Sequence, residues 1–114
     1  QGKLVRVIKG SVLDLAVDIR TNSATFGESF QLELSESNAK MLWIPVGFLH
    51  GFVSLEDDTI FTYKVTGKYD KENEYGVRYD DPTFNIKWPL ASDELIVSEK
   101  DLQLPFFHDT KNPF

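Results

Sequence analysis

The chain has 114 residues, of which 41% are hydrophobic and 26% charged, and its formal net charge is −6. This composition is that of a chain that folds around a core, not of a disordered one. The acidic charge argues against a nucleic-acid partner, because nucleic-acid-binding surfaces are basic, but a few lysines could still bind a small phosphorylated ligand. The absence of cysteine excludes disulfides and thiolate chemistry.

No stretch of the sequence has the pattern of a membrane span or of a secretion signal. A transmembrane helix needs about 20 apolar residues, and no run approaches that length. No charged-then-apolar leader is present either. We therefore expect no membrane partner and a cytoplasmic location. The chain opens on Gln1-Gly2 and passes at once into a predicted strand, so we expect that sequence has been removed upstream.

Alternation of apolar and polar residues, the period of a strand, recurs along the chain. The runs KLVRVIKG (3–10) and SVLDLAVDIR (11–20) alternate in this way and, with the turn signal Lys-Gly between them, predict a β-hairpin. In the second run the even-numbered residues, Asp14 and Asp18 among them, share one face. Further strands are predicted within 30–35, 41–45 and 59–69, and one helical turn from 98 to 101.

The same pass along the chain predicts the fold class. No window has apolar residues at sustained helical spacing, and no repeat or linker divides the chain. Short strands spaced about ten residues apart, with Gly, Asn, Asp and Pro between them, are typical of a β-sandwich or barrel. The sequence therefore predicts one all-β domain over residues 1–114.

Two residues on predicted strands carry polar groups in apolar surroundings. Asp14 lies mid-strand, where an ionised carboxylate is costly unless it has a partner. The alternative is that the face carrying Asp14 and Asp18 is solvated. Tyr63 shares a face with Phe61 and Val65, and a strand tyrosine is more often a packing residue than a catalyst. The pattern leaves both roles open for each residue.

His50 lies within LWIPVGFLHGFVSL, an apolar and aromatic stretch interrupted by proline and glycine. A metal site needs several ligands at close spacing, and the only other histidine, His108, is far away in the tail. A neutral core histidine and a substrate-facing donor both stay open. Gly51 favours the donor, because glycine lets a ligand approach the backbone.

Motifs that would indicate other chemistry are absent from the sequence. There is no GxGxxG, no GxxxxGK[ST] and no GxSxG, so a phosphate-binding loop and a nucleophilic serine have no support. The side chains that remain available for acid–base catalysis are those of histidine, tyrosine, lysine and the carboxylates.

Six blocks follow one another in unbroken order from Gln1 to about Pro105: GKLVRVIKGSVLDLAVDIR, TFGESF, LSESNAKMLWIPVGFLHGFVSL, TYKVTGKYDKENEYGVRYDDP, IKWP and SEKDLQLP. In these blocks the chain closely resembles the dTDP-4-dehydrorhamnose 3,5-epimerase family. The resemblance implies a cupin-type jelly roll that forms homodimers, in agreement with the strand pattern. It also implies a reaction of dTDP-L-rhamnose biosynthesis, from dTDP-4-dehydro-6-deoxy-D-glucose to dTDP-4-dehydro-L-rhamnose, without a metal or an organic cofactor.

The resemblance assigns roles to individual residues. The proton donor of the family, a tyrosine, matches Tyr63, and the carboxylate that pairs with the catalytic base matches Asp101. Substrate-binding positions match Lys3, His50, Glu74 and Lys100. Removal of the proton puts negative charge on the ketone oxygen of the substrate, and preorganised hydrogen-bond donors are needed to stabilise it. Reprotonation needs a proton donor of high pKa, which is about 10 for a phenol such as that of tyrosine.

One part of the family pattern is missing from the sequence. The catalytic histidine of the family lies in a GLHYQ-like block upstream of GKLVR, and this chain has no such block. His108 lies beyond Asp101 and is not expected to substitute. The chain is thus predicted to be the C-terminal portion of an epimerase. The alternatives are a nucleotide-sugar-binding cupin without catalysis, and a related single-carbon epimerase or keto-isomerase.

Overall fold

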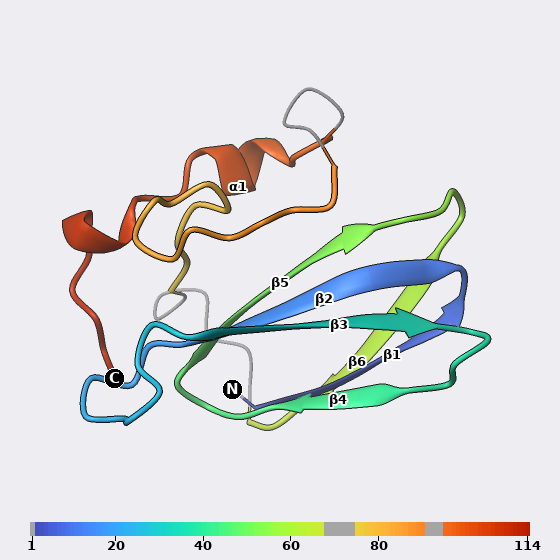
Figure 1. The fold of residues 1–114 in the computed structure, drawn as a ribbon, viewed down its shortest axis with the longest axis horizontal. Helices are drawn as coiled ribbons and strands as arrows, with labels where there is room; N and C mark the ends of the chain where they lie inside the picture. The colour runs from blue at the N-terminus through green and yellow to red at the C-terminus, as the bar shows by residue number, and fades with distance from the viewer. Residues whose placement is uncertain (1, 68–74, 91–94) are drawn as a thin grey trace.

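The computed structural model describes residues 2–67, 75–90 and 95–114 of the chain. Its elements are β1 (Lys3–Lys9), β2 (Ser11–Asp18), β3 (Ser29–Ser35), β4 (Met41–Ile44), β5 (Phe48–Ser54), β6 (Ile60–Val65), α1 (Glu99–Leu102) and the 3-10 turn η2 (Phe107–Asp109). The strands form two antiparallel sheets that face each other (Figure 1). The predicted all-β fold and the helical turn near residue 98 are confirmed. No helix in the described ranges is long and apolar enough to cross a membrane.

Sheet A has the strand order β4-β1-β6 and sheet B the order β3-β2-β5. The predicted hairpin between residues 3–10 and 11–20 is therefore wrong, because β1 and β2 belong to different sheets. Gly10, at φ +83°, turns the chain from one sheet into the other, and its Cα lies so close to Thr59 that a side chain there would clash. Each of the two strands then becomes the centre of its own sheet.

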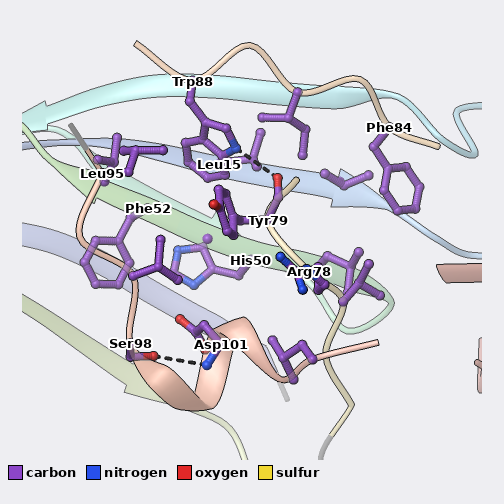
Figure 2. A pocket seen from close by; sticks show the side chains of 18 of the residues that line it. Leu15, His50, Phe52, Arg78, Tyr79, Phe84, Trp88, Leu95, Ser98 and Asp101 are labelled. Carbon is purple, nitrogen blue, oxygen red and sulfur yellow. Dashed lines mark hydrogen bonds between the residues drawn. The ribbon is translucent and has the colours of Figure 1, made fainter. Parts of the chain in front are cut away.

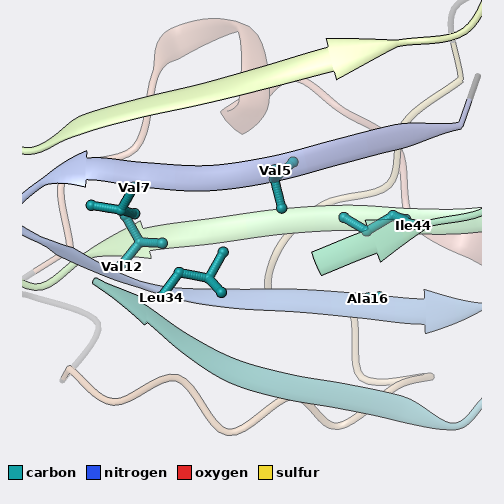
Figure 3. Packing of buried hydrophobic residues seen from close by; sticks show 6 residues of the cluster. All are labelled: Val5, Val7, Val12, Ala16, Leu34 and Ile44. Carbon is teal, nitrogen blue, oxygen red and sulfur yellow. The ribbon is translucent and has the colours of Figure 1, made fainter. Parts of the chain in front are cut away.

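The inner core lies between the two sheets (Figure 3). The inward-facing residues of β1 and β2 meet there, and each fully buried aliphatic side chain stabilises the fold by about 1.5–3 kcal/mol. Its buried members are Val5, Val7, Val12, Ala16, Leu34 and Ile44. The predicted division of β2 into odd and even faces is confirmed, but both faces are buried.

The outer core covers the other face of sheet B. Figure 1 shows the C-terminal part of the chain, orange to red, on this side of the molecule. Leu15, Val17, Ile19 and Phe84 are its buried residues. The indole N–H of Trp88 donates a hydrogen bond to the Tyr79 carbonyl at 2.9 Å, which satisfies the one polar atom of a ring packed against this core.

Asp81 fastens the C-terminal segment to the outer core. Its side chain is buried and accepts hydrogen bonds from the backbone N–H groups of Thr83, at 2.8 Å, and of Phe107. Burial acts to raise the pKa of Asp81, but the hydrogen bonds from Phe107 and Thr83 outweigh it and the pKa is lowered. The ionised carboxylate thus joins two segments that lie 26 residues apart.

A second buried carboxylate, Asp18, organises the loop between β2 and β3. It accepts hydrogen bonds from the Arg20 guanidinium at 3.0 Å, from Ser23 Oγ at 2.6 Å and from Thr25 Oγ1 at 2.5 Å. The bond from Arg20 is the main cause that lowers the pKa of Asp18 far below its usual range, against the effect of burial. Arg20 also lies over the Phe48 ring, 4.9 Å from its centroid.

Candidate functional site

A cavity of about 440 Å³ lies beside β5, at the edge of sheet B (Figure 2). Residues from both faces of β5 line one side of the cavity, and residues of the C-terminal segment line the opposite side. Strands β2 and β5 contribute Leu15, Val17 and residues 49–54, and the C-terminal segment contributes Val77, Arg78, Tyr79, Phe84, Ile86, Trp88, residues 95–98, Asp101 and Leu104.

His50 and Asp14 form a buried pair on the inner faces of β5 and β2. The distance between His50 Nε2 and Asp14 Oδ1 is 2.7 Å, and the two side chains are 10% and 0% exposed. In the strand register Asp14 lies opposite Phe52 and His50 opposite Ala16, so the two side chains are diagonal neighbours on one face. The prediction that Asp14 needs a partner is confirmed, and the solvated alternative for Asp14 and Asp18 is wrong, because both are fully buried.

This pair fixes the chemistry that His50 offers. An ionised carboxylate only accepts hydrogen bonds, so the Nε2 proton of His50 is donated to Asp14. Nδ1 is then the remaining ring nitrogen, and no hydrogen bond to it occurs within the described part of the chain. Nδ1 is an acceptor in the neutral ring and a donor in the imidazolium. The second oxygen of Asp14, Oδ2, is buried without a hydrogen-bond partner among the described residues.

Aromatic rings flank the imidazole on the inner face. The rings of Phe52 and Phe61 stack with a centroid distance of 4.4 Å, and each ring centroid is 6.2 Å from that of His50. Tyr63 continues this row, 6.4 Å from Phe61. Phe52 and Tyr63 are 49% and 62% exposed, although both lie on inward-facing positions of their strands. The space between the sheets is therefore open at β5 and β6, and aromatic side chains line the opening.

Sheet A places Lys3 and Tyr63 on its inner face. Tyr63 pairs with Val5 and Lys3 pairs with Val65, so the two residues are diagonal neighbours across β1 and β6. Neither residue lines the cavity that contains His50. The structure thus places Tyr63 in the same aromatic row as His50, whereas Lys3 lies one step further along sheet A.

The C-terminal segment brings Asp101 to the cavity. Asp101 lies in the single turn of α1, whose N-cap Ser98 accepts a hydrogen bond from the Asp101 backbone N–H at 3.2 Å. Its side chain and that of His50 line the same cavity (Figure 2), although they come from elements 51 residues apart in the sequence. Lys100 precedes it on α1 and is not among the lining residues. Glu74 lies outside the described residues.

Several lining residues were not singled out from the sequence. Arg78 lines the cavity, and its guanidinium donates hydrogen bonds to Asp80 at 2.9 Å and to the Leu102 carbonyl at 3.1 Å. The bonds to Asp80 raise the pKa of Arg78. Tyr79 and Trp88 also line it. The only sequence signal for these positions is that each one places an aromatic or cationic residue within a loop that is otherwise polar.

The described residues contain no group of three or more His, Asp and Glu side chains that could hold a metal ion. His108, on η2, is 70% exposed and lies 3.2 Å from Asp109. It is not a cavity residue.

Comparisons with known proteins match this geometry to one family. The sequence profile of dTDP-4-dehydrorhamnose 3,5-epimerases matches residues 1–109. The enzyme of that name from Methanothermobacter thermautotrophicus is 51% identical over 102 residues, which are 89% of this chain and 55% of the relative. The chain therefore spans about half the length of the curated relatives it matches.

Solved structures agree with the sequence match. The epimerase from Elizabethkingia anophelis superposes with a TM-score of 0.94 at 44% identity and covers 98% of this chain and 61% of its own. The enzyme from Legionella pneumophila, solved in complex with dTDP-4-keto-L-rhamnose, has a TM-score of 0.91 at 42% identity, with 96% and 58% covered. A 3'-monoepimerase from Streptomyces bikiniensis, in complex with dTDP-quinovose, is more distant, at 29% identity and a TM-score of 0.83, with 92% of this chain and 52% of its own covered. With its cupin-type fold, this chain belongs to the dTDP-4-dehydrorhamnose 3,5-epimerase family.

Proposed function

We propose that the protein containing this chain converts dTDP-4-dehydro-6-deoxy-D-glucose to dTDP-4-dehydro-L-rhamnose, by inverting carbons 3 and 5 of the sugar. The observation that carries the proposal is the buried Asp14–His50 pair beside a cavity, in a chain of this family. The Legionella relative, solved with dTDP-4-keto-L-rhamnose, supports the substrate class.

Both inversions begin with removal of a proton from a carbon next to the ketone. The electron pair that is left moves onto the ketone oxygen, which becomes an enolate oxygen, and donors held in place stabilise that charge. We assign His50 to this oxygen as a donor through Nδ1, a role that requires protons on both ring nitrogens, since Nε2 donates to Asp14. Lys3, on the inner face of sheet A, is the second donor in the proposal.

Reprotonation from the opposite face of the sugar completes each inversion. We assign this step to the phenol of Tyr63, which lies at the opening between the sheets and is exposed enough to meet a ligand. Asp101 is proposed to orient the histidine that acts as the base, since a carboxylate fixes the tautomer of a histidine. Lys100 and Glu74 are proposed as substrate contacts, as the resemblance implies.

The base itself is not among the histidines of this chain. The sequence contains only His50, which the resemblance assigns to substrate binding, and His108, which lies outside the cavity. We therefore expect the 114-residue chain alone to bind dTDP-sugars without turning them over. A protein of the relatives' length that contains this chain is expected to catalyse the reaction.

Solvent deuterium tests the proposal. The longer protein is incubated with the keto-sugar in deuterium oxide, and NMR locates the label. Label at both carbon 3 and carbon 5, together with the L-rhamno product, is the expected result. The 114-residue chain is the matched control and should show saturable binding of dTDP without any label. Failure of the longer protein to label either carbon would contradict the proposal.

A single-carbon epimerase is the second candidate, because a 3'-monoepimerase is among the structures that superpose on this chain. That relative is 29% identical, whereas the 3,5-epimerases reach 51%. The same labelling experiment separates the two functions. Label at carbon 3 alone would favour the single-carbon enzyme.

We also propose a homodimer and a cytoplasmic location. The homodimer follows from the resemblance, and the outer face of sheet A supports it with exposed Ile8, Met41 and Trp43, which are 49%, 50% and 52% exposed. The lack of cysteine supports a reducing compartment. Light scattering after size-exclusion chromatography tests the homodimer, and a mass twice that of the monomer is expected. Fractionation of cells tests the cytoplasmic location.

A further inference from the structure

The aromatic rings beside His50 point to a way in which the sugar is selected, an inference that rests on the proposed function. The proposed substrate is a 6-deoxy sugar, so carbon 5 carries a methyl group where glucose carries a hydroxymethyl group. A site that prefers this substrate needs an apolar surface close to the donor that binds the ketone oxygen.

Phe52 supplies such a surface. Its ring is 49% exposed although it lies on the inner face of β5, and it lines the cavity. Phe61 supports this ring. The ring centroids of Phe52 and Phe61 are 4.4 Å apart in a stacked arrangement, and Phe61 also packs against the inner core. The Phe52 ring is thus held in place by a neighbour while its other side is left for a ligand.

The position of Phe52 matches the geometry of the sugar. The ketone oxygen on carbon 4 and the methyl group on carbon 5 are substituents of adjacent ring atoms. If the oxygen meets His50, the methyl group must lie close to the imidazole. Phe52 and Phe61 flank the imidazole, each with a centroid distance of 6.2 Å.

The polar side chains nearest to Phe52 in the register already form hydrogen bonds within the protein. Asp14, directly opposite Phe52 in the register, is fully buried and bonded to His50. Ser54, two residues beyond Phe52, donates its hydroxyl to the Glu56 carbonyl at 2.7 Å. Placing an unpaired hydroxyl against aromatic rings is unfavourable. We infer that Phe52, held by Phe61, is a specificity-determining residue that receives the 6-methyl group and disfavours 6-hydroxy sugars.

Two nucleotide sugars that differ only at carbon 6 test the inference on the 114-residue chain. The dissociation constants of dTDP-6-deoxy-D-glucose, dTDP-D-glucose and dTDP are measured by NMR titration. We expect the 6-deoxy sugar to bind about 10- to 100-fold more tightly than dTDP-D-glucose, the range in which an apolar pocket discriminates against an added hydroxyl. Phe52→Ala should bring the ratio close to one, and Phe52→Leu should keep part of the preference.

Phe30→Ala is the matched control. Phe30 is a strand phenylalanine of similar exposure, 54%, that does not line the cavity, so its removal should leave the ratio unchanged. A ratio near one in the unmodified chain, or an unchanged ratio in Phe52→Ala, overturns the inference while the proposed function stands. Equal weakening of dTDP and of both sugars in Phe52→Ala also overturns it, since Phe52 would then stack on the thymine. If none of the three ligands binds, the inference fails together with the expectation that the 114-residue chain alone binds dTDP-sugars.

Discussion

At His50, the hydrogen bond to Asp14 decides which nitrogen is available to a ligand. We predict that the neutral ring carries its proton on Nε2, because Asp14 accepts there at 2.7 Å. Long-range proton–nitrogen NMR of the chain distinguishes the two tautomers. The control is the exposed His108, for which a mixture of tautomers is expected. A neutral ring that carries its proton on Nδ1 and none on Nε2 would contradict the donation from Nε2 to Asp14.

Replacement of His50 should affect both stability and rate. His50→Ala leaves the buried Asp14 carboxylate without its partner, which typically costs about 3–5 kcal/mol of unfolding free energy. His50→Gln can still donate to Asp14 and should fold better. In the longer protein, His50→Gln should lower turnover by about 10²–10³, the usual effect of losing one donor to an oxyanion. His108→Ala is the control, and turnover of His50→Gln equal to that of His108→Ala would make His50 a structural residue.

Tyr63→Phe should separate proton removal from inversion. Abstraction does not require the phenol, so deuterium exchange at the first face is expected to continue while formation of the L-rhamno product stops. Tyr75→Phe is the control, since the Tyr75 hydroxyl bonds Thr110 at 2.7 Å and its ring packs against the outer core. Normal product formation by Tyr63→Phe would remove Tyr63 from the proposed mechanism.

At the scale of elements, the loop after β2 depends on Asp18. Asp18→Asn should lower the free energy of unfolding at pH 7 by about 2–3 kcal/mol, since hydrogen bonds to a charged group are lost. The pKa of Asp18 is lowered in the folded state, so its contribution is present above the unfolded pKa of about 4 and is lost as the pH falls below it. Asp18→Asn should therefore reduce the loss of stability between about pH 4 and pH 2.

Urea unfolding at several pH values measures this effect. Asp80→Asn is a suitable control, because Asp80 also bonds an arginine, Arg78, but is 42% exposed and should contribute little. If the two variants have the same stability at every pH, the Asp18 network does not stabilise the loop.

The same elements show what the sequence could and could not predict. Period-two alternation located β1, β2, β3, β4 and β6 and divided β2 into two faces, because side chains of a strand alternate by geometry alone, but it did not locate β5 (Phe48–Ser54). It could not identify strand partners, and the predicted hairpin of β1 with β2 was wrong, since a Lys-Gly turn serves equally well to cross between sheets. At the candidate site, mid-strand Asp14 indicated a need for a partner, but the choice of His50 depends on the register of β2 and β5.

At the scale of the whole molecule, β2 connects the two cores. Its even-numbered residues, such as Val12, pack between the sheets, and its odd-numbered residues, such as Leu15, pack under the C-terminal segment. The cavity that contains His50 and Asp101 lies where the C-terminal segment meets sheet B. The geometry of the candidate site therefore depends on the packing of the outer core.

We predict that residues 1–114 unfold as one domain, because β2 cannot leave one core without leaving the other. In Trp43→Phe, the single remaining indole, Trp88, reports on the outer core, and far-ultraviolet circular dichroism reports on the strands. The two signals should change at the same urea concentration. Phe84→Ala, which removes a buried ring from the outer core, should shift both transitions together by about 3–5 kcal/mol, whereas the exposed Phe30→Ala should shift neither appreciably. A fluorescence transition at a lower urea concentration than the loss of the strand signal would contradict this prediction. It would show that the C-terminal segment separates from an intact pair of sheets, and that Asp101 then separates from His50.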